Sequence, residues 1–393
     1  MSLSAADFKA PALAGAVATL AGTAASLGLV MSAFTALGAS ETQTITAIAV
    51  MLALYGFLSI VLSWFFKMPI SIVWSTPGAA LLVASGTLHY GFASAVGAFL
   101  VAAVLLVLTG TWPWLGRLAS SVPKPIAAAM LAGVLFNFCI APFQAIQTFP
   151  QVVIPAVLVW VLLMRFAKIW AAPAAMTIIL VFGSISQGIQ LDWSHWLPQF
   201  AVVTPDFNWG AIVSIGIPLY LVTMASQNIP GVAIMKSLGY EVPFAASMVS
   251  TGLGSAVSAL FGGFALNLAA ITAALNADEH AHPDRNKRWL SSVLGGVGYI
   301  ALALVAGVVV NLALRMPHEL ILTAAGLALV VTISNSLKTA TEEEGLRVPA
   351  IVTFLTTTSG IVVFGIGSAF WALLTGVLFW VVTRRIPKAA SRL

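Results

Sequence analysis

The feature that most constrains this chain is a succession of apolar runs, each about 20 residues long, separated by short breaks rich in Gly, Pro or charge. A helix of about that length crosses the hydrocarbon core of a bilayer. Only 7% of the residues are charged, against about 25% in soluble domains, so too few charges are present to cover a water-facing surface. We predict an all-α polytopic membrane protein with fourteen transmembrane segments, at 11–33, 43–66, 69–88, 92–113, 123–142, 151–166, 171–190, 210–238, 243–260, 262–276, 289–313, 318–337, 348–365 and 367–384.

Two similar halves are visible along the sequence. Pro155, within Ile-Pro-Ala-Val-Leu, recurs as Pro349 within Val-Pro-Ala-Ile-Val, and the Ala-Gly pair ending at Gly133 recurs at Gly326, with offsets of 194 and 193 residues. Chance matches in a chain so rich in Ala, Gly and Leu are the alternative explanation. If the repeat is real, seven segments per half is an odd number, and the halves enter the membrane in opposite directions. We therefore predict a 7+7 inverted repeat, which is common among secondary transporters.

The basic residues fall almost entirely on one side of this topology. With both termini placed in the cytoplasm, 16 of the 17 Lys and Arg residues lie in cytoplasmic regions and only Arg315 lies outside. Orientation in membranes follows this bias, which predicts a multi-pass inner-membrane protein with both termini cytoplasmic. The scattered distribution also argues against nucleic acid as a partner, despite the net charge of +5. The single Cys139 excludes an internal disulfide.

The third and tenth segments are expected to be broken rather than continuous helices. Residues 69–75 begin with proline and are rich in β-branched residues, which favours extended backbone. Thr76 is then expected to cap a helix that has Pro77 at its first position. Residues 262–266 begin with two glycines, and Asn267 is expected to cap the second helix in the same way. Each segment is therefore predicted to be a short extended strand followed by a half-helix.

Two such half-helices suggest a binding site. In an inverted repeat their N-termini would face each other near the middle of the membrane, and irregular backbone at that depth is tolerated only inside protein or beside a watery cavity. Each helix N-terminus carries about half a positive charge and unpaired N–H groups, which suits a carboxylate without any Arg or Lys. The alternative is a proline kink plus a glycine-packed helix crossing.

The eighth segment carries Ser226, Gln227 and Asn228 in succession at membrane depth. Adjacent positions of a helix face different ways, so packing alone satisfies three polar side chains poorly. Gln227 and Asn228 could hydrogen-bond a substrate carboxylate or a water. Equally well, they could join neighbouring helices beside the kink at Pro230.

The titratable residues give weaker signals. No carboxylate is placed confidently at membrane depth, where a charge would indicate function. His280 and His282 have metal-ligand chemistry, but they are expected to lie in a solvated cytoplasmic loop, and we predict no metal site. His89 and Glu241, both at segment ends, are the weak candidates for a proton-coupling residue.

At several of these places the chain resembles the benzoate transporter (BenE-type benzoate:proton symporter) family. The resemblance runs the whole length and is carried by residues 74–82 (Trp-Ser-Thr-Pro-Gly-Ala-Ala-Leu-Leu), 221–231, 270–274, 281–284, 288–290 and 365–371. It implies proton-coupled uptake of benzoate or a related aromatic carboxylate. It also implies the 7+7 fold shared with nucleobase and sulfate-type transporters, in which a core domain moves against a gate domain, often as a dimer joined through the gates. On that fold the core would comprise residues 1–114 and 209–314, and the gate 115–208 and 315–393.

One departure from relatives of this fold concerns acidic residues. Nucleobase transporters commonly carry them in the eighth and tenth segments, where this chain has Gln227, Asn228 and Asn267, which do not titrate. A neutral site suits an anionic substrate, because no carboxylate repels it. It leaves proton coupling without an assigned residue; protonation of the substrate, or of a segment-end group, is open.

These observations lead to one hypothesis, a secondary active transporter that imports an aromatic carboxylate by alternating access, with no cofactor. A nucleobase or other small-anion carrier of the same fold is the alternative, and an intramembrane enzyme or a passive channel is a more distant one. An enzyme would need paired catalytic groups at depth, and none is found. The predicted substrate contacts are Ser75, Thr76, Pro77, Gly78, Gln227, Asn228, Gly263, Phe264, Leu266, Asn267 and Leu268.

Overall fold

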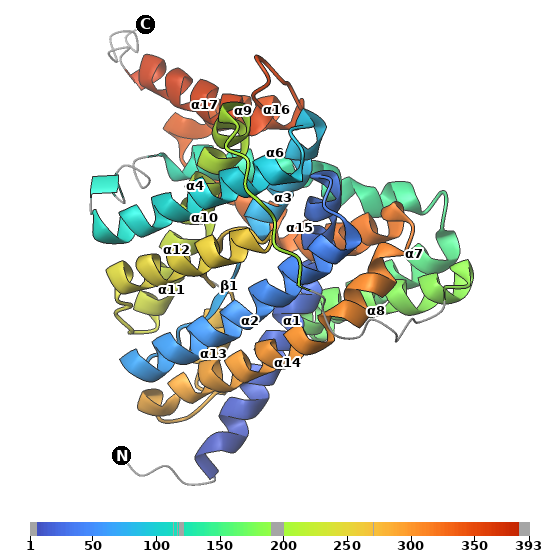
Figure 1. Ribbon diagram of the computed structural model, residues 1–393, viewed down its shortest axis with the longest axis vertical. Helices are drawn as coiled ribbons and strands as arrows, with labels where there is room; N and C mark the ends of the chain where they lie inside the picture. Colours follow the sequence, from blue (N-terminus) through green and yellow to red (C-terminus); the bar gives the residue numbers. More distant parts are fainter. Residues whose placement is uncertain are drawn as a thin grey trace, which may run out of the picture.

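The computed structural model describes residues 6–112, 114–115, 117, 122–189, 200–269 and 271–384. Over these residues the chain is a bundle of helices around one two-stranded sheet (Figure 1). Each of the fourteen predicted segments contains a helix or a strand followed by a helix. Eight of the described helices are long and apolar enough to cross a bilayer, and several shorter apolar helices accompany them. The number of crossings stays a prediction.

The first half contains nine named elements. They are α1 (Ala6–Ala36), α2 (Glu41–Phe66), β1 (Ile72–Trp74), α3 (Thr76–Ser85), the 3₁₀ turn η1 (Gly86–Leu88), α4 (Phe92–Thr111), α6 (Lys124–Ala145), α7 (Pro150–Phe166) and α8 (Lys168–Gln187). Of the polar stretch expected between the two halves, residues 190–199 lie outside the described residues, and residues 200–208 contain no helix or strand.

The second half begins with one long helix. Its parts are α9 (Trp209–Ala211), η2 (Ile212–Gly216), α10 (Ile217–Thr223), η3 (Met224–Asn228) and α11 (Ile229–Ser237), where η2 and η3 are π-helical turns. There follow α12 (Phe244–Leu260), β2 (Leu266–Leu268), α13 (Ile271–Ala277), the 3₁₀ turn η4 (Arg285–Lys287), α14 (Trp289–Leu314), α15 (His318–Glu342), the 3₁₀ turn η5 (Glu344–Leu346), α16 (Arg347–Thr358) and α17 (Ser368–Arg384).

The thirteenth segment is shorter than predicted. It was expected to be helical over 348–365, but α16 ends at Thr358 and the chain is irregular until α17 begins. Gly360 has a φ of +65°, a left-handed conformation that ends helices and that glycine adopts without steric cost. The apolar residues after Gly360 belong to the connection, not to the helix.

Helices α2 and α14 pack through glycines. A Cβ placed on Gly56 would lie 2.4 Å from the carbonyl oxygen of Gly296, and one on Gly296 would lie 2.7 Å from that of Gly56. Small residues let two backbones approach closely, which is how helices associate in a bilayer that supplies no hydrophobic driving force between them. Large apolar side chains instead lie exposed on the outside, including Phe65, Phe166 and Ile185. This distribution is expected of a lipid-facing surface.

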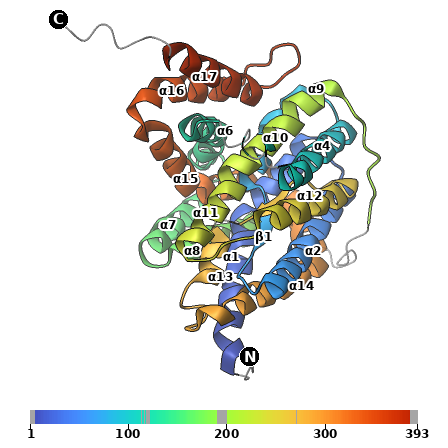
Figure 2. The same ribbon diagram turned by 90° about the vertical axis from the view of Figure 1, so that its left-hand side faces the viewer.

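The other helix contacts form two groups. Helix α4 packs on α12, and α1 packs on α3 and α14, while α6 packs on α15 and α16, and α7 packs on α8. Figure 2 shows α15, α16, α17 and α6 toward one end of the long axis, and α2, α13 and α14 toward the other. Strand β1 lies between them at the centre of the bundle in both views. Helix α1 also contacts α8 and α15, so it touches both groups.

Candidate functional site

The two extended segments form one antiparallel ladder at the centre of the bundle. Ile72 pairs with Leu268, Val73 with Asn267 and Trp74 with Leu266. The ladder is prolonged at each end, where the Ser75 N–H donates to the Ala265 carbonyl at 3.2 Å and the Ala269 N–H donates to the Ser71 carbonyl at 2.9 Å. Extended backbone in the third and tenth segments is therefore confirmed. That the two strands pair with each other was not predicted from the sequence.

The outer edges of this ladder are bonded by serines at equivalent places in the two halves. The Ile72 N–H donates to Ser59 Oγ of α2 at 2.9 Å, and the Leu266 N–H donates to Ser255 Oγ of α12 at 2.8 Å. The two serines are separated by 255 − 59 = 196 residues, and the two strand residues by 266 − 72 = 194. These offsets match that of the sequence repeat. The inverted repeat thus extends to individual hydrogen bonds, and the serine spacing was a signal that could have revealed them.

Helix α3 begins one residue earlier than predicted. Its N-cap is Ser75, not Thr76: Ser75 has extended backbone and its Oγ accepts from the Gly78 N–H at 3.1 Å. The Ala79 N–H donates to the Ser75 carbonyl at 2.8 Å, and Pro77 has no N–H. Of the first four positions of α3, only Thr76 has an N–H without an acceptor among the described residues. At the start of α3, the predicted cluster of unpaired amides is therefore reduced to one.

The predicted cap of the second half-helix is also wrong. Asn267 lies within β2, and α13 begins four residues later, at Ile271. The Asn267 side-chain N–H donates to the Leu268 carbonyl at 2.9 Å, whereas its Oδ1 is buried without a partner among the described residues. The sequence placed the end of the strand too early because Leu268 to Ile271 is as apolar as a helix would be.

The long eighth helix supplies polar groups to both strands. Asn228 is fully buried, and its Oδ1 accepts from the Leu268 N–H at 2.9 Å. Thr223 Oγ1 donates to Ser75 Oγ at 2.9 Å. Leu219 packs against Gly78, where a Cβ would lie 2.6 Å from the Leu219 side chain. Asn228 therefore bonds backbone, as the packing interpretation expected. Thr223 was missed: alone among apolar neighbours, it carries no signal until α3 is placed beside it.

Gln227 differs from the polar residues around it. It is half-buried, and no hydrogen bond joins its amide to any described residue. It lies in η3, where the Ile229 N–H donates to the Met224 carbonyl five residues back. Single π-helical turns are rare and occur frequently at functional sites, because the extra residue redirects side chains.

Several of the predicted substrate contacts are buried in the packed interior, namely Gly263, Phe264, Leu266 and Leu268. Phe264 has no exposed surface, and its ring packs against Phe34 and Phe99 with centroids 5.8 and 6.3 Å away. A Cβ on Gly263 would lie 2.1 Å from Ser258 Oγ. In this conformation these side chains stabilise the fold and do not line an opening.

The two candidates for proton coupling lie apart from the ladder. His89 and Glu241 are both exposed, in connections between helices. His89 has a φ of +52° and lines a cavity of about 210 Å³ together with Ser85, Tyr90 and the ends of α1 and α3. Neither residue contacts the ladder through any hydrogen bond of the described structure.

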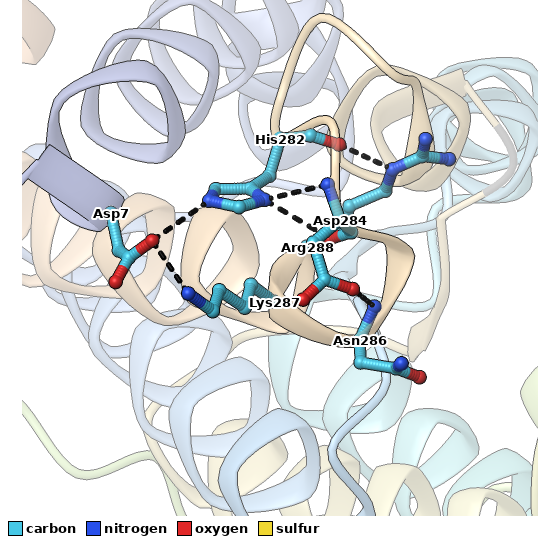
Figure 3. Close-up of polar contacts among 6 residues, drawn as sticks. All are labelled: Asp7, His282, Asp284, Asn286, Lys287 and Arg288. Atoms are coloured by element: carbon cyan, nitrogen blue, oxygen red, sulfur yellow. Dashed lines mark hydrogen bonds and ion pairs between the residues drawn. The ribbon is translucent and has the colours of Figure 1, made fainter. Parts of the chain in front are cut away.

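Polar contacts attach the histidine-containing connection between α13 and α14 to the start of α1, and we call this cluster the joint (Figure 3). Asp7 of α1 accepts from Lys287 Nζ at 2.7 Å and lies 3.3 Å from His282 Nε2. The Asp284 N–H donates to His282 Nδ1 at 2.9 Å, and the Asp284 carbonyl oxygen lies 3.1 Å from the same nitrogen. The solvated-loop interpretation is correct for His280, whose side chain is 90% exposed, and wrong for His282, which is buried.

This joint also fixes the far end of the second half-helix. Arg288 donates through Nε to the His282 carbonyl at 2.8 Å and through Nη1 to the Ala277 carbonyl, the last of α13, at 2.9 Å. A cation at a helix C-terminus satisfies carbonyls that the helix leaves unpaired. Nearby, burial raises the pKa of Tyr240, although Arg288 and Arg285 act in the opposite direction.

Comparison with known proteins places this geometry among membrane transporters. Residues 6–382 match the family model BenE, benzoate membrane transport protein. The chain is 37% identical to the inner membrane protein YdcO of Escherichia coli over 95% of its length and 96% of that protein. It is 34% identical to the benzoate membrane transport protein of Acinetobacter baylyi over 84% of both chains.

Solved structures of the same fold are more distant in sequence. The transmembrane domain of the cyanobacterial bicarbonate transporter BicA matches with a TM-score of 0.60 at 14% identity, over 97% of this chain and 98% of that one. The murine anion transporter Slc26a9, in an inward-facing state, matches with a TM-score of 0.60 at 14% identity, over 97% of this chain and 69% of that one. These likenesses show the fold, which is the 7+7 inverted repeat.

Proposed function

Because the chain belongs to the benzoate membrane transport protein family, we propose that it imports benzoate or a related aromatic carboxylate across the inner membrane, together with protons. Membership of this family makes it a multi-pass membrane transporter and not an enzyme. The substrate, the proton coupling and the cytoplasmic placement of both termini are parts of the proposal. The single observation that supports the substrate is the set of neutral donors at the start of α3.

The donors come from two residues. The Thr76 N–H and hydroxyl have no partner among the described residues, and neither has the Gln227 amide. Gln227 follows Thr223, which donates to Ser75 Oγ at 2.9 Å, and directly precedes Asn228, which accepts from the Leu268 N–H at 2.9 Å, so it lies on the helix that contacts both strands. A carboxylate there would accept from Thr76 and Gln227 and would meet the positive end of α3. Ser75, Asn228 and Asn267 would hold this arrangement in place instead of binding the substrate directly.

Transport then requires the site to open to each side in turn. We propose that residues 1–114 and 209–314 form a core and that 115–208 and 315–393 form a gate, with a homodimer joined through the gates. One contact between the two proposed units supports a closed state. The hydroxyls of Tyr90, just before α4, and of Ser214, in η2, both donate to the Gly365 carbonyl, on the connection between α16 and α17. Alternating access would break this contact when the cavity beside His89 and Tyr90 opens.

The test is uptake of labelled benzoate into proteoliposomes, with and without an inward proton gradient. We expect saturable uptake that the gradient accelerates and that excess unlabelled aromatic acid abolishes. Protein-free liposomes are the control, and counterflow separates a carrier from a channel. Competition by nucleobases, with none by aromatic acids, would contradict the substrate and favour the alternative carrier.

The binding site is tested by Gln227→Leu. Loss of one hydrogen bond to a charged group costs about 1.5–3 kcal/mol, which is about a 10- to 150-fold loss of affinity. The matched control is Gln187→Leu, since Gln187 ends α8 in an exposed position. Equal affinity in both variants would exclude Gln227 from the site.

A further inference from the structure

Lys67, the C-cap of α2, lies between two tryptophan rings. Its Nζ is 4.1 Å from the ring centroid of Trp64 and 4.0 Å from that of Trp289, the first residue of α14. The two rings meet edge to face, with centroids 5.2 Å apart. A cation is attracted to the face of an aromatic ring, most strongly to tryptophan, so the rings hold the ammonium group where α2 ends and α14 begins. We call these three residues the cage.

Positive charge in and beside the cage is not matched by a carboxylate within the described residues. The ion pairs found there join other side chains, and Lys67 is exposed. An ammonium group has three N–H donors, and this one is open to an acceptor on its exposed side. Arg288, which precedes Trp289, donates to the carbonyl oxygens of His282 and Ala277, and these carry no formal charge. The cage therefore suits an anionic acceptor such as a phosphate.

An apolar track leads away from the cage along the seam between α2 and α14, which lie side by side in both views (Figures 1 and 2). On α2 its residues are between 43% and 58% exposed and recur at helical spacing on one face, and they are Phe57, Val61 and Trp64. On α14 the exposed residues are Val297, Ile300 and Leu304. No charged residue interrupts the track, because residues 42–66 and 289–314 contain no Asp, Glu, His, Lys or Arg.

The track ends in a groove of about 300 Å³ that is lined almost wholly by apolar atoms. Its walls include Ala53 and Phe57 of α2, Ile300 of α14 and Phe200 of the connection that precedes α9. Phe57 lies ten residues before Lys67, which is about 15 Å along a helix. One leaflet contributes about half of a hydrocarbon core that is about 30 Å thick. An acyl chain whose headgroup lies at the cage is therefore long enough to reach the groove.

We propose that the cage binds the phosphate of an anionic phospholipid and that one acyl chain of this lipid follows the track into the groove. The phosphate accepts from the Lys67 ammonium group, and the two tryptophans lie at the level of the headgroup, where this residue is enriched in membrane proteins. Because α2 belongs to the first half of the chain and α14 to the second, the lipid joins the two halves across their seam. The proposal does not depend on which solute the protein carries.

Thermal unfolding in a non-ionic detergent with added lipid tests the headgroup site. We expect phosphatidylglycerol to raise the Tm more than phosphatidylcholine with the same acyl chains, because only the former carries net negative charge. Lys67→Gln should raise the phosphatidylglycerol concentration needed for half of this effect about fivefold. Lys338→Gln, which removes another exposed cation, from α15, is the control and should leave that concentration unchanged. Equal responses to the two lipids, or equal changes in the two variants, would overturn the proposal.

A second measurement distinguishes a lipid from a free phosphate compound. Glycerol 3-phosphate has the phosphate without acyl chains, and we expect it to leave the Tm unchanged at the concentrations where phosphatidylglycerol raises it. Ala53→Phe fills the groove and should weaken the response to phosphatidylglycerol, whereas Ala16→Phe adds the same ring at an exposed position of α1 and should not. Stabilisation by glycerol 3-phosphate equal to that by the lipid, or equal responses of the two variants, would contradict a lipid whose chain lies in the groove.

Discussion

The bond between Thr223 and Ser75 predicts a specific pattern of non-additive stability changes. Ser75 Oγ accepts from both Thr223 and the Gly78 N–H, and Ser75 and Thr223 are fully buried. Ser75→Ala loses the cap, at about 1 kcal/mol, and leaves a buried Thr223 hydroxyl unbonded, at about 1–3 kcal/mol. The expected total is about 2–4 kcal/mol. Thr223→Val loses one hydrogen bond, which costs about 1 kcal/mol.

The double variant should cost less than the sum of the two. With Thr223 replaced by Val, no hydroxyl is left unbonded when Ser75 becomes Ala, so we expect about 1–2 kcal/mol against an additive sum of about 3–5 kcal/mol. The assay is reversible unfolding in mixed micelles with increasing SDS, followed by tryptophan fluorescence. Thr251→Val is the control, because its hydroxyl bonds only to its own helix, and it should be additive with Ser75→Ala. Additivity of Ser75→Ala with Thr223→Val to within about 0.5 kcal/mol would refute the hydrogen bond.

Three further predictions concern closure, packing and pH. Tyr90→Phe removes the hydrogen bond to the Gly365 carbonyl beside the cavity that Ser85 lines. It should therefore speed maleimide labelling of a Ser85→Cys reporter several-fold in a Cys139→Ser background. An unchanged labelling rate would contradict the proposed closed contact. Gly56→Ala should lower unfolding free energy by about 1–3 kcal/mol, since its Cβ would lie 2.4 Å from a carbonyl of α14, and wild-type stability would exclude that close packing. Burial raises the pKa of Tyr240, so the folded state keeps this proton to higher pH than the unfolded state and stability falls above about pH 10. Tyr240→Phe should lessen that fall, as measured by unfolding across pH, and an identical alkaline loss in both proteins would refute this.

The broken third and tenth segments were predictable because their composition differs from that of a continuous helix. Pro69 and the paired glycines at Gly262 interrupt helix formation locally, and such effects act within a few residues. The exact cap was not predictable. Ser75 and Thr76 are both good N-caps, and the choice depends on Thr223, which lies far away in the sequence.

The pairing of the two strands lay beyond local reasoning. Which N–H groups of the two strands are bonded outside the ladder depends on long-range partners, namely Ser59, Ser255 and Asn228. Of these three residues only Asn228 was a predicted contact, and nothing in the local sequence assigns any of them to a strand edge. For the same reason Gln227 and Asn228 were given the same predicted role. Asn228 bonds the backbone of β2, whereas the Gln227 amide has no partner among the described residues.

The most direct test of the proposed site is to locate a bound aromatic acid. A crystal of the protein with 4-bromobenzoate would place the bromine by anomalous scattering and the carboxylate by density. We predict a carboxylate beside the Thr76 N–H and the Gln227 amide, where β1 gives way to α3. A ligand bound instead in the cavity beside His89, with the start of α3 empty, would contradict the assignment.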